Sequence, residues 1–224
     1  MILAEGLSHP ASLAYALLLP AVVHQWPGKG ELVRERVETA TALASEQGFK
    51  CWTIWGVILH GWGLTQAGQS TQGIRLLGEG LAAWQESGSQ IFRPYFLALL
   101  AEGYAQAGQV EDGLRTVIDG LACVERTEER WHEAELYRLK GELTLQAGDL
   151  NEAEACFRNA IDIAQRQATK SWELRAVMSL ARLWQEQGKQ TEAHKLLSDS
   201  YNWFSEGFDT KDLREAKGLL EELG

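Results

Sequence analysis

Five glycines recur at intervals of forty residues, and this spacing constrains the fold more than any other feature of the chain. They are Gly28, Gly68, Gly108, Gly148 and Gly188. A fixed period between about twenty and about fifty residues is typical of proteins built from stacked copies of one supersecondary unit. We therefore predict five copies of one unit, with a long surface available for binding and no single central core.

Each unit is predicted to consist of two helices joined by a turn at the glycine. Glycine suits this place because the residue that follows a helix commonly adopts a left-handed conformation. The expected first helices cover 10–26, 51–67, 91–107, 131–147 and 171–187. The expected second helices cover 31–47, 70–87, 110–127, 150–168 and 190–205.

Residues at fixed distances from the glycines indicate how these helices pack. Seven residues before each glycine the side chain is small, as in Ala21, Gly61, Ala101, Gly141 and Ala181. Twelve residues after it the side chain is again small, as in Ala40, Gly80, Gly120, Ala160 and Ser200. Nine residues after it stand large apolar side chains, namely Val37, Leu77, Val117, Phe157 and Leu197. Small residues allow two helices to approach closely while large ones fill the space beside them.

The two ends of the chain differ in how well they are covered. A last helix over 210–223 carries leucines at helical spacing and is expected to cap the fifth repeat. No equivalent helix precedes the first one, which Pro20 should kink or shorten. Either residues 1–9 cover the first helix, or the chain is cut from a longer protein, or two copies pack there. We favour the cut, with self-packing as its consequence.

The expected organisation is one solenoid over residues 1–224. Its repeats cover 10–49, 50–89, 90–129, 130–169 and 170–208, and its capping helix covers 209–223. Pro94 falls in the first turn of its helix, where a missing N–H costs little.

Charge and composition exclude several classes of partner. The net charge is −10, which disfavours nucleic acid and anionic membranes. Three cysteines without paired spacing suit a reducing cytosol, so we expect a cytoplasmic protein. The most apolar stretch, 11–23, is too short to span a membrane, and the start of the chain lacks the features of a signal peptide.

No group of residues forms a convincing active site. Gly28-Lys29-Gly30 lacks the glycine spacing and the Ser or Thr of a phosphate-binding loop. His132-Glu133 begins like a zinc-protease motif but has no second histidine four positions after the first. We therefore expect no catalytic residues, no metal and no cofactor, and hence not an enzyme.

The fourth repeat, residues 134–160, resembles a tetratricopeptide repeat. The matching positions are Gly141, Gly148-Asp149, Ala153, Phe157 and Ala160. The resemblance implies an all-α fold, a right-handed superhelix or α-solenoid of five two-helix repeats. The period departs from the consensus of about thirty-four residues, and we expect the extra residues to lengthen the second helix and its exit loop.

A narrower resemblance covers nearly the whole chain. Segments 93–102, 171–184 and 207–216 resemble the C-terminal repeat region of bacterial proteins that join a nucleotide-cyclase domain to a predicted ATPase. Those catalytic domains are absent here. The resemblance implies a context, the regulation of a signalling enzyme, rather than an activity of this chain.

The resemblance also implies where a partner would bind. In such repeats the first helices line the concave face, and the groove positions lie about thirteen, ten, six, three and two residues before the turn glycine. The residues that we assign to partner binding on this basis are Trp55, Trp62, Tyr95, Glu102, Arg138, Arg175 and Arg182. The aromatic side chains would anchor an extended peptide or a partner helix, and the arginines would take acidic side chains or a C-terminal carboxylate. The alternative is a short or tight superhelix in which these residues pack on each other.

Three functions remain open from the sequence. The leading one is a non-catalytic module that binds a protein or peptide, or that docks on the ATPase or cyclase domain of its own parent protein. The second is a small-molecule sensor, in which a metabolite fills the groove. The third is a scaffold that self-associates as a homodimer through the uncovered first helix.

Overall fold

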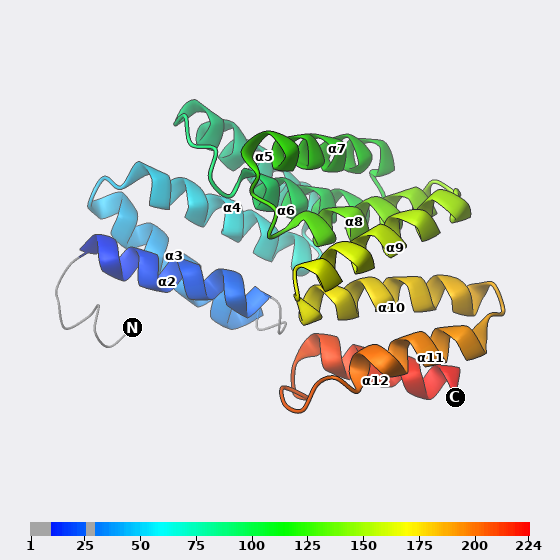
Figure 1. Ribbon diagram of the computed structural model, residues 1–224. Coiled ribbons are helices and arrows are strands. Elements are labelled where there is room, and N and C mark those ends of the chain that lie inside the picture. Colours follow the sequence, from blue (N-terminus) through cyan, green and yellow to red (C-terminus); the bar gives the residue numbers. More distant parts are fainter. Residues whose placement is uncertain (1–9, 26–29) are drawn as a thin grey trace. The chain divides into compact units, whose positions relative to one another are not determined.

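The structure is a computed structural model that describes residues 10–25 and 30–224. These residues form eleven helices and contain no strand (Figure 1). The contacts divide the chain into two compact units, one that ends at Ala107 and one that begins at Gly108. The boundary coincides with the turn glycine of the third repeat. The single solenoid over residues 1–224 stays a prediction.

The first unit consists of helical hairpins. Its described helices are α2 (Pro10–Gln25), α3 (Gly30–Glu46), α4 (Lys50–Gln66), α5 (Ser70–Glu86) and α6 (Arg93–Gln106). Each helix packs on the next one along the chain, and the first helices of successive repeats also contact each other, α2 with α4 and α4 with α6. The first helices therefore form one layer within this unit.

The second unit follows the same plan. Its helices are α7 (Val110–Thr127), α8 (Glu133–Gln146), α9 (Leu150–Arg166), α10 (Lys170–Glu186), α11 (Gln190–Tyr201) and α12 (Lys211–Leu223). The first helices α8 and α10 again contact each other, and the capping helix α12 takes the position of a further first helix against α10. The helix α12 covers α10 and α11 and buries Leu213, Ala216, Leu219 and Leu223.

The turns at the glycines have the expected left-handed backbone. Gly68 and Gly148, for example, have φ of 78° and 91°. The same conformation also occurs halfway between each of these glycines and the next one along the chain. These intermediate positions are Gly88, Glu128 and Ala168, with φ of 78°, 58° and 54°. The structural period of the turns is therefore twenty residues. Gly28 lies outside the described residues.

Close helix packing at the small residues is confirmed. A Cβ atom added to Gly61 would lie 2.9 Å from the Gly73 carbonyl oxygen and 2.9 Å from the Leu77 nitrogen. One added to Gly141 would lie 2.5 Å from Cε1 of Phe157. The large side chains nine residues after each glycine are at most 1% exposed; they are Val37, Leu77, Val117, Phe157 and Leu197.

Three expectations about individual helices need correction or refinement. Pro20 does not shorten α2, which continues to Gln25, because packing against neighbouring helices can outweigh one missing hydrogen bond. The second helix is longer than the first in the third repeat (18 against 14 residues) and in the fourth (17 against 14), but the two are equal in the second repeat. In the fifth repeat α11 ends at Tyr201, earlier than expected.

Pro94 stands in the first turn of α6, as predicted.

Within the part of the chain that the structure describes, no helix is both long and apolar enough to cross a membrane.

Candidate functional site

The aromatic residues of the first unit are mostly core. Trp55 is 1% exposed, and its ring centroid lies 4.9 Å from that of Phe92 and 6.2 Å from that of Phe96. Tyr95 is likewise 1% exposed. The expectation that Trp55 and Tyr95 present accessible rings to a partner is therefore wrong for this conformation. Phe92 and Phe96 of the following repeat cover Trp55.

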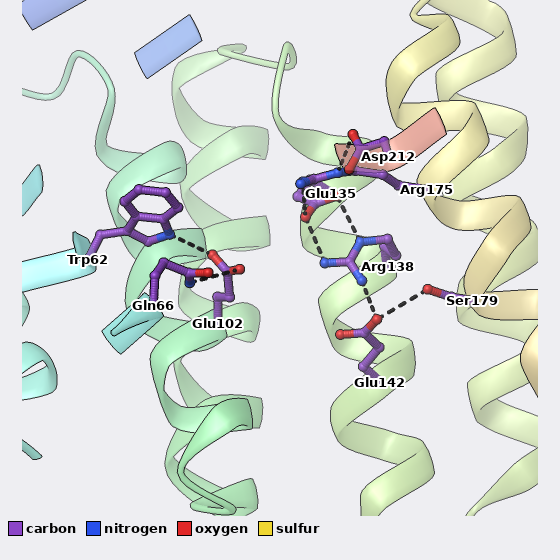
Figure 2. Close-up of polar contacts among 9 residues, drawn as sticks. All are labelled: Trp62, Gln66, Glu102, Glu135, Arg138, Glu142, Arg175, Ser179 and Asp212. Carbon is purple, nitrogen blue, oxygen red and sulfur yellow. Dashed lines mark hydrogen bonds and ion pairs between the residues drawn. The ribbon is translucent and has the colours of Figure 1, made fainter. Parts of the chain in front are cut away.

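Trp62 joins two successive first helices. Its indole Nε1 on α4 donates a hydrogen bond of 2.9 Å to Oε2 of Glu102 on α6 (Figure 2). The amide of Gln66 donates a second one, of 3.3 Å, to Oε1 of the same carboxylate. Trp62 and Glu102 stand forty residues apart in the same column of the repeat. The structure thus brings together two of the residues that the sequence assigned to the site.

In the second unit, Arg138 lies between two carboxylates of its own helix. Its Nη2 and Nε donate to Oε1 and Oε2 of Glu135 at 2.7 and 2.8 Å, which is a bidentate pair. Its Nη1 donates to Glu142, one turn further along α8 (Figure 2). The Arg138 side chain is only 11% exposed. Bidentate pairing fixes both the position and the plane of the guanidinium group.

Residues of α10 and α12 extend this arrangement. Arg175 of α10 donates to Oε1 of Glu135 at 3.2 Å and to Oδ2 of Asp212 at 3.0 Å. The Ser179 hydroxyl donates to Glu142 at 3.1 Å. Three first helices are therefore linked by charged groups on one face. We call this set the ionic row: Glu135, Arg138, Glu142, Arg175, Ser179 and Asp212 (Figure 2).

Arg182 lies on the exposed continuation of the ionic row. Its side chain is 48% exposed, and its Nη2 is 3.8 Å from Oε2 of Glu215 on α12. A pair at this distance and exposure contributes little to stability. Of the arginines on this face, Arg182 is therefore the one that a partner can contact with the smallest loss of existing interactions.

The ionic row holds its acidic groups in different environments. Burial opposes the charge of Glu135, but the guanidinium groups of Arg138 and Arg175 outweigh it and lower its pKa to about 2. Burial raises the pKa of Asp212, although Arg175 acts in the opposite direction. Three carboxylates and two guanidinium groups leave the row with one excess negative charge.

His132 packs directly behind the ionic row. Its ring centroid is 4.9 Å from those of Trp131 and Trp172, and Arg175 lies over the Trp172 ring at 5.4 Å. Burial lowers the pKa of His132 to about 4, so the imidazole is neutral near neutral pH. A neutral, enclosed ring of this kind supports packing rather than proton transfer.

The sequence missed Asp212 and Ser179 as members of this face. Both make contacts with partners thirty-seven residues away, while the Trp62–Glu102 and Arg175–Glu135 contacts span forty. An offset of nearly one period is therefore the signal that could have found them. The columns are counted from the turn glycine that follows each first helix. The last helix is not followed by such a glycine, so the pattern gives no column for Asp212.

The polar groups of this face are largely engaged with one another. The carboxylates of the ionic row are engaged by guanidinium groups, and no cluster of histidine, cysteine or acidic side chains suited to a metal ion occurs among the described residues. What the face offers is an alternation of hydrogen-bond donors and acceptors along successive helices.

Comparison with known proteins gives the fold. No family model matches the chain, and no curated protein sequence does. Solved structures do match. A Rap protein in complex with competence and sporulation factor superposes with a TM-score of 0.76 at 16% identity, over 94% of this chain and 64% of that one. TPR-like repeats of a putative kinesin light chain from Podospora anserina give a TM-score of 0.60 at 19% identity, over 86% of this chain and 94% of that one.

The chain has the fold of tetratricopeptide-like helical repeats. A signal-transduction ATPase with numerous domains and a tetratricopeptide repeat sensor, from Pyrococcus horikoshii, matches as well, with a TM-score of 0.67 at 13% identity. That match covers 92% of this TPR-like chain but 31% of the ATPase. The chain thus spans less than two thirds of the Rap protein and about a third of the ATPase.

Proposed function

We propose that this TPR-like chain is a non-catalytic interaction module that binds an acidic segment of a protein on the face of its first helices. The observation that carries the proposal is the way α10 holds α12. Two arginines of α10, Arg175 and Arg182, each face a carboxylate that a neighbouring helix presents, Asp212 and Glu215. The face is thus built to hold carboxylates that protrude from a helix or extended chain.

The residues proposed for binding divide by their burial. Arg182 would make the direct contact, because it is the most exposed. Arg138 and Arg175, which the carboxylates of the ionic row already engage, would hold the geometry of the face from below. Trp62 and Glu102 would form the corresponding contact in the first unit, whereas Trp55 and Tyr95 would act through packing alone.

The similar structures support a regulatory context for this proposal. One of them is a Rap protein in complex with a factor, and another contains a tetratricopeptide repeat sensor in a signalling ATPase. By analogy, the chain would serve as the regulatory repeat region of a cytoplasmic bacterial signalling protein. Its partner would be another protein or an ATPase or cyclase domain of the same polypeptide.

A selection with a displayed peptide library tests the proposal. Peptides with acidic side chains or a free C-terminal carboxylate should be enriched on the wild-type chain. Arg182→Glu should weaken the selected peptides by about tenfold or more, since it replaces an attractive charge by a repulsive one. Arg115→Glu is the matched control, because Arg115 is 72% exposed on the second helix α7 and should leave binding unchanged.

The proposal is wrong if no acidic sequence is enriched, or if the selected peptides bind Arg182→Glu as tightly as they bind the wild type.

A second candidate function, self-association through α2, is favoured by one observation. Tyr15 on α2 is 43% exposed and meets Trp52 edge-on at 5.5 Å, so an aromatic surface lies open there. Sedimentation equilibrium of the wild type and of Tyr15→Glu tests it. A homodimer that the substitution dissociates would support this function, and a monomer at every concentration would exclude it.

A further inference from the structure

A cavity of about 380 Å³ opens between α3, α4 and α5 in the first unit. It is distinct from the face proposed for protein binding, because its walls come from two second helices and from a different side of α4. Its apolar wall consists of Val37, Ala42, Val57 and Leu76, and its polar groups come from Glu38, Thr41, Ser45, Thr53 and His60. A mainly apolar hollow with a few polar groups is the usual form of a small-molecule site, and its volume falls within the usual range.

The cavity exists because two columns of the repeat lose their large side chains here. Gly56 stands where the next two repeats have Phe96 and Leu136, both fully buried. Thr41 stands where later repeats have Leu81 and Ile161. The Thr41 side chain packs directly on Gly56, where an added Cβ atom would collide with the Thr41 hydroxyl oxygen, so the hollow lies beside this pair rather than over Gly56. The lining of the hollow is mainly apolar, so it favours an apolar occupant.

A third column supplies a polar group at the same place. His60 lies half-buried in the cavity wall, where the third and fifth repeats have Leu100 and Leu180. An imidazole adds one hydrogen-bond donor and one acceptor to an otherwise apolar wall. The exchange of leucine for histidine therefore adds a means of orienting a ligand.

The charge around the cavity limits the ligand further. The Glu38 carboxylate is exposed at the cavity and the chain carries a net charge of −10, both of which repel anions. For scale, a cavity of about 150 Å³ holds one benzene ring, so this one has room for roughly two fused rings.

We propose that this cavity is a binding site for a neutral, compact, mainly apolar molecule of about two fused rings that carries one hydroxyl or carbonyl group. The rings lie in the hollow beside Thr41, against Val57 and Leu76. The polar group of the ligand hydrogen-bonds to the imidazole of His60.

Calorimetric titration with three probes tests the site: 2-naphthol, naphthalene and 2-naphthoate. The wild-type chain should bind 2-naphthol saturably at one site, naphthalene more weakly, and the anionic 2-naphthoate more weakly than 2-naphthol. Ala42→Trp should abolish binding, because the indole fills the cavity from an exposed position. Ala82→Trp is the matched control, since Ala82 is the exposed residue of the same column one repeat later and lies outside the cavity.

A further variant, His60→Leu, isolates the polar contact. Leucine already occupies this column in two other repeats, so the fold should tolerate it, which circular dichroism would verify. The variant should bind 2-naphthol no better than naphthalene. The proposal is overturned if no probe binds saturably to the wild type, or if Ala42→Trp binds 2-naphthol as well as Ala82→Trp does. Equal 2-naphthol affinity of the wild type and His60→Leu would overturn the assigned role of His60.

Neither result depends on the peptide selection described above, because the two experiments use different variants and different ligands.

Discussion

At Ala168 the backbone adopts a left-handed conformation without a glycine. Its φ is 54°, and the turn has the same hydrogen bonds as the turn at Gly188, with the Ala168 N–H donating to Gln165 and the Thr169 N–H donating to Ala164. A residue with a Cβ atom is strained in this conformation by about 1–2 kcal/mol. The surrounding helices therefore impose the turn on alanine.

Replacing Ala168 by glycine should relieve this strain. We expect Ala168→Gly to raise the free energy of unfolding by about 0.5–1 kcal/mol, less than the full strain because glycine is more flexible in the unfolded chain. Ala147→Gly is the matched control, since Ala147 has φ of −74° at the end of α8 and should lose stability instead. Urea unfolding measures both. A destabilised Ala168→Gly would contradict the strain.

His132 should make the stability of the chain depend on pH above the range where carboxylates titrate. Burial lowers its pKa from 6.5 to about 4, while Glu135 acts in the opposite direction and Arg175 and Arg138 add to the lowering. Between these two pH values the unfolded chain binds a proton that the folded chain does not. Stability is therefore complete above about pH 6.5 and falls toward pH 4, by about 3 kcal/mol at most.

The substitution His132→Phe should remove this dependence, because Phe92 occupies the same column one repeat earlier. We expect the melting temperature of the wild type to fall more steeply between pH 7 and pH 4.5 than that of the variant. Parallel curves would show that His132 does not titrate in this way. Below about pH 4.5 both proteins should lose stability, because the unfolded chain then takes up a proton at Glu135 that the folded chain, in which this pKa is lowered to about 2, does not bind.

At the scale of the element, the close contact between α8 and α9 depends on the absence of one Cβ atom. Gly141 faces the ring of Phe157, which is completely buried and cannot move away. Gly141→Ala should cost about 1–3 kcal/mol through overpacking, despite the better helix propensity of alanine.

Gly218 in α12 is the control for this prediction. A Cβ atom there would meet nothing within 4 Å, so Gly218→Ala should stabilise the chain by about 0.5–1 kcal/mol. Both variants are compared by thermal and urea unfolding. If Gly141→Ala were as stable as Gly218→Ala, the close approach of α8 and α9 would be wrong.

Most of the element boundaries could be predicted, because the glycine columns mark helix ends five times over and each copy supports the others. The candidate site could be predicted only in part. The columns placed Trp62, Glu102 and Arg175 on one predicted face, but they did not give the contacts that Trp62 makes with Glu102 and Arg175 with Glu135. They could not show that Phe92 and Phe96 cover Trp55, because a column gives the direction of a side chain but not what the next repeat places over it.

At the scale of the whole molecule, contacts between neighbours dominate. Within each unit, the described helices pack on their neighbours along the chain and successive first helices contact each other, so the effect of a substitution should remain near its position. Hydrogen exchange of Gly141→Ala should therefore show faster opening in α8, α9 and α10, while α3 and α4 keep their wild-type protection. Uniformly faster exchange along the chain would contradict this expectation.

The twenty-residue period of the left-handed turns restricts how a chain of this kind changes length. Both kinds of turn have the same backbone shape, so the path of the chain would accept the insertion of one helix and one turn. The helices on either side would not, because every later first helix would then take the place of a second helix. Arg175 would no longer pair with Glu135 and Asp212. The large residues of the second helices would also pack against the wrong neighbours. Viable longer or shorter versions of this protein should therefore differ by whole pairs of helices, in steps of forty residues.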